Sequence, residues 1–152
     1  MTDELVKILL RHVDGDDVNT ETTWAKRVGV NLYELNNLPW YAYGVSCGDV
    51  VEAVQVDESF PELTRVVRKS GNRTLRVILD EAIPGDQNCS PLLDQLKSLG
   101  CSYEGMNRRY FAINIPAAVA LVSVCDALTE SGQQWEHADP TYTQLYPDGE
   151  AG

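Results

Sequence analysis

Short stretches of alternating apolar and polar residues fill the first half of the chain, and each ends in glycine, proline, asparagine or aspartate. Such runs, rich in β-branched and aromatic side chains, are typical of strands separated by turns. The pattern predicts strands over residues 5–13, 22–28, 32–35 and 50–56, with a hairpin around Gly29 between the second and the third. Because these strands are short and closely spaced, they predict a small, strongly bent β-sheet or partial barrel.

Two further β-rich segments, 63–68 and 73–79, flank the sequence Ser70-Gly71-Asn72. A glycine-containing turn between two such segments predicts a hairpin. We therefore expect these two strands to pair with each other. Since the second strand also begins the pattern of the second half, the two halves are expected to share one sheet or core.

The apolar spacing changes to a helical one in the second half of the chain. Ser90 followed by proline is typical of a helix start, and leucines then recur at helical spacing until Gly100. After a hairpin predicted over 103–115, Pro116 is expected to open a second helix that ends before Gly132.

A last strand over 134–138 completes the order β-α-β-β-α-β, counted from the strand at 73–79. This order is that of the split βαβ, or ferredoxin-like, fold, with both helices on one face of the sheet. The sequence therefore predicts an α+β protein. It has a β-rich half over 1–72, a ferredoxin-like half over 73–140 that shares the same core, and an acidic C-terminal tail over 141–152.

The chain carries 23 Asp and Glu against 12 Lys and Arg, which gives a formal net charge of −11. Such a surface repels nucleic acid and anionic lipid, and its field favours the approach of a basic protein. With 43% hydrophobic residues, the 152-residue chain can bury a core. We therefore expect a folded protein with a basic protein partner, and neither nucleic acid nor membrane as a partner.

The start of the chain has no basic segment followed by a long apolar one, which is the pattern of a secretory signal. The longest apolar stretch, 115–125, is interrupted by Pro116 and Ser123 and is shorter than the roughly 20 residues that a membrane helix needs. The expected location is the cytoplasm, where the four cysteines stay reduced. Their spacing predicts no zinc site, and no cofactor is expected.

Catalytic signatures are missing from the sequence, which holds no nucleophile elbow, phosphate-binding loop or zinc-protease motif. Asp14, Asp16 and Asp17 begin like a calcium loop, but the glutamate that should close such a loop is absent. His12 or His137 could serve as a general base, although neither has the neighbouring groups that a reaction requires. The expected function is therefore binding rather than catalysis, with a histidine-based enzyme as a weaker alternative.

Five of the twelve basic residues cluster in one short segment that includes the predicted turn. Like charges that face each other across a strand pair are destabilising, so some of them should meet acids from neighbouring strands. A solvated strand face with ion pairs, or a contact for an acidic protein, would explain the cluster. The alternative is an anion site, in which the aromatic loop at 39–44 joins Arg65, Arg68, Arg73 and Arg76.

No lysine or arginine follows Arg109, whereas six acidic residues do. Aromatic side chains lie among these acids, a combination typical of a contact surface for a basic protein. An ordinary acidic tail that improves solubility is the simpler alternative. The residues expected to bind the partner are Asp126, Glu130, Trp135, Glu136, Asp139, Tyr142 and Tyr146.

Four motifs, around Trp24 and over 37–45, 48–51 and 65–77, resemble those of a bacterial family known as domain of unknown function 4265. The resemblance extends from about Trp24 to the last predicted strand. The chain departs from it at Asn72, where a histidine is expected. The resemblance implies a bacterial cytosolic protein, and it implies no activity, cofactor or catalytic residue.

The residues of these motifs have mainly structural uses. Gly44 and Gly48 permit tight turns, and Asp49 can accept hydrogen bonds from nearby backbone. Thr74 and Arg76 are two positions apart, so they point to the same face of their strand.

Small size, strong negative charge and the acidic, aromatic end of the chain favour one function above others. The chain is expected to be a bacterial immunity protein of the antitoxin type, which binds and occludes a basic cognate toxin domain. A small-ligand or regulatory binding module is the alternative, with the aromatic loop and the arginine cluster as its site.

Overall fold

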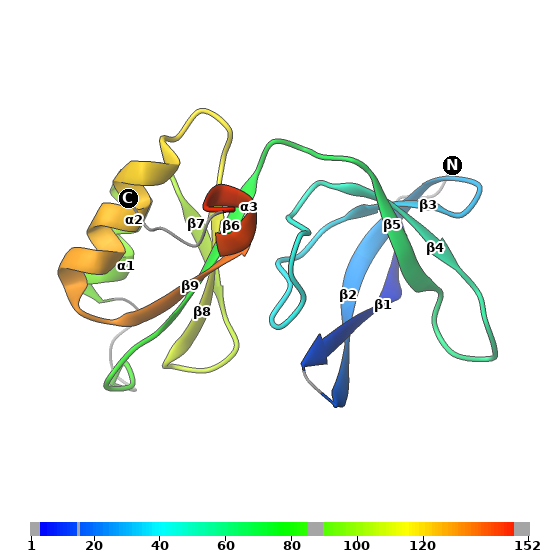
Figure 1. The fold of residues 1–152 in the computed structure, drawn as a ribbon, viewed down its shortest axis with the longest axis horizontal. Helices are drawn as coiled ribbons and strands as arrows, with labels where there is room; N and C mark the ends of the chain where they lie inside the picture. Colours follow the sequence, from blue (N-terminus) through cyan, green and yellow to red (C-terminus); the bar gives the residue numbers. More distant parts are fainter. Residues whose placement is uncertain (1–3, 15, 85–89, 148–152) are drawn as a thin grey trace. The chain divides into compact units, whose positions relative to one another are not determined.

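The computed structural model describes residues 4–14, 16–84 and 90–147, apart from the side chains of 12–14. The chain divides into two compact units, Met1–Asn72 and Arg73–Gly152. Figure 1 shows that strands build the first unit, whereas the second combines strands with helices. Each unit is therefore considered by itself.

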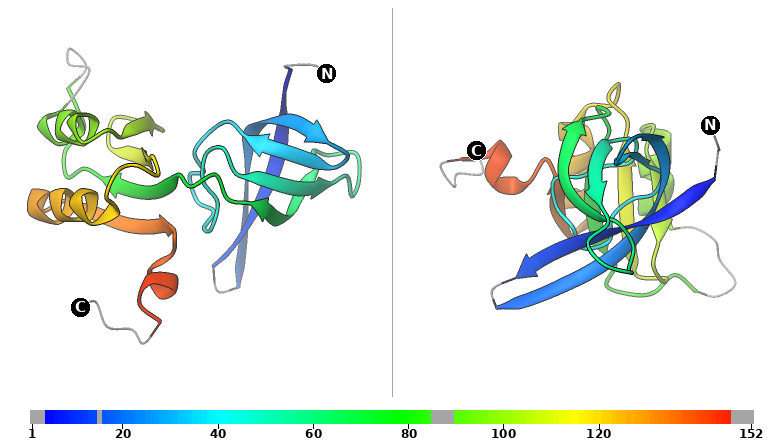
Figure 2. Two further views of the ribbon diagram at one scale, coloured as in Figure 1. Left: turned by 90° about the horizontal axis from the view of Figure 1, so that it is seen from above. Right: turned by 90° about the vertical axis from the view of Figure 1, so that its right-hand side faces the viewer.

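The first unit is a closed barrel in which each strand pairs with the next one along the chain. A parallel contact between Leu9 and Glu62 joins the last strand to the first and closes the barrel. The first two strands form a long hairpin that extends beyond the rest of the barrel (Figure 2). The strands are β1 (Leu5–Asp14), β2 (Asp17–Gly29), β3 (Leu32–Leu35), β4 (Val50–Val54) and β5 (Glu62–Arg68).

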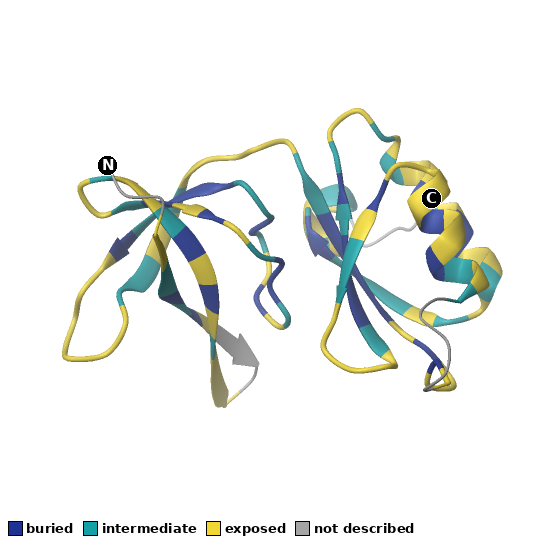
Figure 3. Cartoon of the chain, turned by 180° about the vertical axis from the view of Figure 1, so that it is seen from behind, coloured by how far each residue is buried: buried dark blue, intermediate teal, exposed yellow. Residues whose placement is uncertain are grey.

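Alternate residues of the barrel strands point into its interior, as the two-residue period of a strand requires. Buried and exposed positions therefore alternate along the strands in Figure 3. Ile8 of β1, Leu35 of β3 and Val51 of β4 are among the fully buried residues of this core. On the outer side, the Arg11 guanidinium donates to both carboxylate oxygens of Glu62, at 3.1 and 2.7 Å.

The second unit is an antiparallel sheet with two helices against one face (Figure 1). Its strands lie in the order β7-β8-β6-β9. The β-α-β-β-α-β succession predicted from the sequence is observed, and a short third helix follows it. The elements are β6 (Arg73–Ile78), α1 (Pro91–Ser98), β7 (Ser102–Gly105), β8 (Tyr110–Ile115), α2 (Leu121–Ser131), β9 (Gln134–Asp139) and α3 (Tyr142–Leu145).

Capping residues set the ends of the two longer helices. The Ser90 hydroxyl accepts a backbone N–H of the first turn of α1, and Gly132 ends α2 in a left-handed conformation, with φ at 75°. The second helix begins at Leu121 rather than at Pro116, because a turn closed by a bond from the Val119 N–H to the Pro116 carbonyl (2.9 Å) comes first. None of the described helices combines the length and the apolar character needed to cross a membrane.

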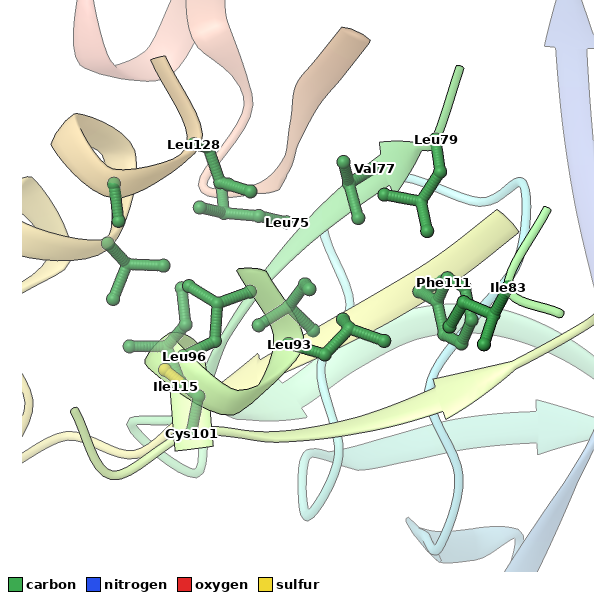
Figure 4. Packing of buried hydrophobic residues seen from close by; sticks show 13 residues of the cluster. Leu75, Val77, Leu79, Ile83, Leu93, Leu96, Cys101, Phe111, Ile115 and Leu128 are labelled. Carbon is green, nitrogen blue, oxygen red and sulfur yellow. The ribbon is translucent and has the colours of Figure 1, made fainter. Parts of the chain in front are cut away.

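The core of the second unit lies between the helices and the facing side of the sheet. Leu75 and Val77 of β6 meet Leu93 and Leu96 of α1 and Leu128 of α2, and all five are fully buried (Figure 4). The buried apolar residues of the barrel form a separate cluster. Each unit thus has a core of its own, whereas the sequence pattern predicted one core shared by the two halves.

The hairpin predicted between β5 and β6 is wrong. β5 pairs with β4 and β1 in the barrel, whereas β6 pairs with β8 and β9 in the second sheet. The turn residues bind another loop instead: Ser70 Oγ and Asn72 Nδ2 both donate to the Cys47 carbonyl, at 2.8 and 2.9 Å. A glycine-containing turn shows where the chain bends, but it does not determine which strands pair.

Candidate functional site

Three of the aromatic residues expected to bind a partner meet around one histidine. The His137 ring centroid lies 4.9 Å from that of Trp135, 5.9 Å from that of Tyr142 and 6.4 Å from that of Tyr146. The two tyrosine centroids are 4.9 Å apart. These four residues are called the His137 cluster below.

Strand geometry places half of this cluster. Trp135 and His137 are two positions apart on β9, so they share one face of the sheet. They lie opposite Val77 and Leu75 of β6, which face the helices, and Trp135 packs against the core there. The cluster therefore rests on the buried interior of the second unit.

A capping box places the other half. The Thr141 hydroxyl accepts the Gln144 N–H at 3.3 Å, and the Gln144 side chain accepts the Thr141 N–H at 2.8 Å. This reciprocal pair starts α3, whose single turn brings Tyr142 and Tyr146 onto one side. The segment expected to be a simple acidic tail thus begins with a helix, and its last five residues, 148–152, lie outside the described residues.

Burial lowers the pKa of His137, because a partly buried site disfavours the charged imidazolium. Its Nδ1 is buried and has no hydrogen-bond partner in the described part of the chain. The ring is therefore neutral at neutral pH, and the cluster is aromatic rather than charged. Tyr142 is 38% exposed, which leaves its ring open to a partner.

The acidic residues predicted to bind a partner fall on two different surfaces. Asp126 and Glu130 are exposed and lie four positions apart on α2, so they share the side of the helix away from the core. Glu136 and Asp139 are on β9, opposite Arg76 and Thr74, on the sheet face that points away from the helices. Asp139 is buried and Glu136 is half-buried, so among these four the α2 carboxylates are the ones most open to a partner.

The four arginines of the alternative anion site lie on strands of two different sheets. Arg65 and Arg68 belong to β5, and Arg73 and Arg76 belong to β6. Arg65 Nε lies 3.4 Å from a Glu52 carboxylate oxygen. The Arg73 guanidinium donates to the carbonyl oxygens of residues 116 and 119. Without the β5–β6 hairpin, the strand pairing expected to align the four cations is lost.

Arg76, from the alternative anion site, lies beside Glu136, from the set of residues expected to bind a partner. Its side chain is 1% exposed, and its guanidinium lies 3.4 Å from the Glu136 carboxylate. A buried cation is costly unless an anion compensates it. Glu136 therefore stabilises the buried Arg76, and the Glu136 carboxylate is less available to a partner.

The backbone of the aromatic loop is bound to a carboxylate of the same unit. Glu21 accepts the N–H groups of Trp40, Tyr41 and Ala42 at 2.7, 2.6 and 2.8 Å. Successive N–H groups of this kind are what an anionic ligand would use. Since Glu21 occupies them, this part of the alternative anion site is filled by the protein itself.

Residues of the family motifs meet at the carboxylate of Asp49, which is fully buried. It accepts the N–H groups of Ser70 and Ser46, each at 2.8 Å, and lies 2.5 Å from Lys69 Nζ. Gly48 is in the left-handed conformation, and a Cβ there would lie 3.0 Å from the Ser70 Cβ. These contacts fasten the loop before β4 to the end of β5. We call these five residues the Asp49 joint.

Other sequence candidates contribute no assembled site. The side chains of His12 and Asp14, and all of Cys89, lie outside the described residues. Burial raises the pKa of the Cys101 and Cys125 thiols, which keeps both protonated and unreactive at neutral pH.

The fold and these sites define a protein of two units, a five-stranded barrel followed by an α+β unit with an aromatic cluster at its edge strand. The sequence profile of the family described as Domain of unknown function (DUF4265) matches residues 21–138, and the chain belongs to this family. No curated protein matches the chain.

A solved structure has the same fold. It is described as a novel crystal structure of a hypothetical protein from Neisseria gonorrhoeae and superposes with a TM-score of 0.78. The match covers 93% of this chain and 99% of the other. At 14% sequence identity, the likeness shows the fold alone.

Proposed function

We propose that this protein is a bacterial immunity protein of the antitoxin type, which binds a basic cognate toxin domain and covers its active site. The net charge of −11 supports this proposal, because opposite charge speeds the encounter with a basic partner. The observation that carries it is the His137 cluster. It gathers three aromatic residues in a segment that has six acids and no lysine or arginine.

The proposed contact uses the rings as anchors and the helix carboxylates for steering. Aromatic side chains held on a packed core are typical of the few residues that dominate binding energy. Tyr142 and Trp135 fill this role, while Asp126 and Glu130 pair with lysine or arginine of the toxin. Glu136 and Asp139 act mainly within the fold.

The proposal includes three further points. The protein acts by binding rather than by catalysis, and it acts in the cytoplasm, where an intracellular toxin has to be neutralised. The second unit is a ferredoxin-like unit, an assignment supported by the strand order β7-β8-β6-β9 and by two helices on one face of the sheet.

The decisive experiment is to sequence the reading frames that flank the gene and to co-express this protein with any basic protein that they encode. Wild-type protein should co-purify with that protein and restore growth. The variant Tyr142→Ala combined with Trp135→Ala should lose both effects, with a decrease in affinity of at least tenfold, about 1.4 kcal/mol. Trp24→Ala, which removes an exposed ring from the barrel, is the matched control and should bind like wild type.

Charge variants test the steering role separately. Asp126→Asn combined with Glu130→Gln should slow association at low salt and have little effect at high salt, because exposed charges are screened there. Asp94→Asn on the exposed side of α1 is the control. Undiminished toxicity in the presence of folded wild-type protein would refute the immunity function.

A further inference from the structure

A groove of about 550 Å³ in the barrel unit has features that the proposed function does not use. It combines aromatic rings with two cations, and its volume is within the range of small-ligand sites. Its lining residues are Val6, Lys7, Trp24, Arg27, Tyr33, Phe60 and Pro61.

Three strands and one loop build the groove. Lys7 of β1 lies opposite Trp24 of β2, and Arg27 of β2 lies opposite Tyr33 of β3. The loop before β5 supplies Phe60. The next residue, Pro61, is bound to β1, because its carbonyl oxygen accepts the Leu9 N–H at 2.8 Å. The strand residues of the lining are therefore held by ladder hydrogen bonds, and the loop is held to β1 at one backbone contact.

Two of the rings are unusually open for their size. Trp24 is 44% exposed and Phe60 is 46% exposed, whereas Tyr33 is buried in the barrel core. Exposed aromatic side chains gathered in one hollow provide flat apolar surface that a bound molecule could cover.

The two cations of the groove have no carboxylate partner among the described residues. Lys7 Nζ lies 5.2 Å from the Trp24 centroid and 5.7 Å from the Phe60 centroid, and no described carboxylate is within 4.0 Å of it. Arg27 donates from Nε to the Gly29 carbonyl at 3.2 Å, and its terminal nitrogens have no described hydrogen-bond partner. By contrast, the arginines at 11, 65 and 76 each lie near a glutamate.

This arrangement is notable in a chain with 23 acidic and 12 basic residues, where carboxylates are abundant. Two cations beside open rings, both without a carboxylate in the described part of the chain, match a ligand that brings its own negative charge and a flat apolar body. A ligand with a single negative charge fits best, because the net charge of −11 repels multiply charged anions at long range.

We propose that the groove binds a small aromatic organic anion, whose acidic group pairs with Lys7 and Arg27 and whose ring packs on Trp24 and Phe60. A charge-assisted contact fixes the orientation of the ligand, and the rings supply most of the apolar contact. This inference is independent of the proposed immunity function, since it concerns the other unit.

Two dyes with the same aromatic body provide the test. The first is 1-anilinonaphthalene-8-sulfonate, which carries one sulfonate, and the second is N-phenyl-1-naphthylamine, which is neutral. The folded wild-type protein should bind the sulfonate about tenfold more tightly than the neutral dye, as measured by fluorescence titration.

Variants then locate the site. Lys7→Met and Arg27→Gln should each weaken sulfonate binding several-fold and leave the affinity for the neutral dye unchanged. Trp24→Ala should weaken both dyes. Lys97→Met, which removes an exposed cation from α1, should change neither, and a thermal melt of each variant confirms that it is folded.

Several results would overturn the inference. Equal affinity for the two dyes, no binding of either dye, or sulfonate binding that survives both Lys7→Met and Arg27→Gln would each do so. Preference for an acidic aromatic peptide over the sulfonate dye would reassign the groove to a protein partner. Because all groove variants lie in the barrel, failure here leaves the toxin-binding experiment unaffected.

Discussion

Several carboxylates of the first unit hold the protein's own backbone in place. Glu21 accepts three N–H groups of the aromatic loop, and the carboxylate of the Asp49 joint accepts two more and meets Lys69. Glu62 is similarly occupied by Arg11. Fewer carboxylates are therefore open to a partner than the 23 acidic residues of the sequence indicate, although the net charge stays at −11, and the exposed acids of α2 gain importance.

Replacing Asp49 with asparagine tests the joint. The amide keeps the size of the side chain but loses the charge that faces Lys69, and its NH₂ group cannot accept the second backbone N–H. Asp49→Asn should lower the free energy of unfolding of the barrel unit by about 2 kcal/mol, as measured by urea denaturation. The control is Asp57→Asn, at an exposed turn where the side chain accepts hydrogen bonds from the N–H and the hydroxyl of Ser59. Its effect should be below about 0.5 kcal/mol.

His137 makes stability depend on pH. Because burial lowers its pKa below 6.5, folding favours the neutral ring. The folded state thus binds fewer protons than the unfolded state, and this contribution is complete above pH 6.5 and lost as the pH falls through the folded pKa. The free energy of unfolding should decrease between pH 7 and pH 5. The variant His137→Phe should show a smaller decrease, and equal decreases in the two proteins would contradict the assignment.

At the scale of elements, local signals predicted the two longer helices and most strands, whereas pairing between distant segments was not predictable. Ser90 and Gly132 mark helix ends through contacts within a few residues, so their roles are visible in the sequence. The partner of β5 depends on the closing of the barrel by β1, a contact between Leu9 and Glu62 that no local pattern records. The wrong hairpin followed from this limit, and so did the expectation that strand pairing aligns the four arginines.

The candidate site was predictable only in part, because its residues can be read locally but their assembly depends on contacts between β9 and α3. Trp135, Tyr142 and Tyr146 were expected from their aromatic character, but the central position of His137 depends on where α3 folds. Glu136 and Trp135 lie on opposite faces of the sheet, which follows from the two-residue period of a strand and could have been predicted. The Thr141–Gln144 capping box, which positions both tyrosines, is a further signal of the sequence from which the start of α3 could have been predicted.

Thr141→Ala tests whether α3 depends on its cap. Loss of the hydroxyl leaves the Gln144 N–H without its acceptor, and the local stability of α3 should decrease by about 1 kcal/mol. Hydrogen exchange of the Leu145 and Tyr146 amides, which bond within this turn, should become faster by roughly fivefold. Thr129→Ala, within α2, is the control and should leave these two amides unchanged.

At the scale of the whole molecule, the two separate cores make the second unit a candidate for independent folding. Its cluster includes fully buried residues from β6, α1, β8 and α2, so one interior holds both helices to the sheet. The boundary after Asn72 leaves all of these residues in one piece.

A fragment of residues 73–152 should therefore unfold cooperatively in urea, with a sigmoidal change in circular dichroism. Within this fragment, Leu96→Ala should lower the free energy of unfolding by about 3 kcal/mol, because it leaves a cavity at a site that is 0% exposed. Val122→Ala, at an exposed position of α2, is the control. A fragment without a cooperative transition would show that the second unit needs the first in order to fold.

The Asp49 joint has a consequence for how this family can vary over evolution. A carboxylate, a lysine and a glycine from two distant segments depend on one another there, so a change at one position should be tolerated only together with a change at another. Relatives that lack the acid at position 49 should also lack the lysine at 69, and those with a larger residue at 48 should have lost the serine at 70. Paired changes of this kind would show that the motifs maintain the fold of the barrel unit. Each family member could then bind its own partner through a different surface.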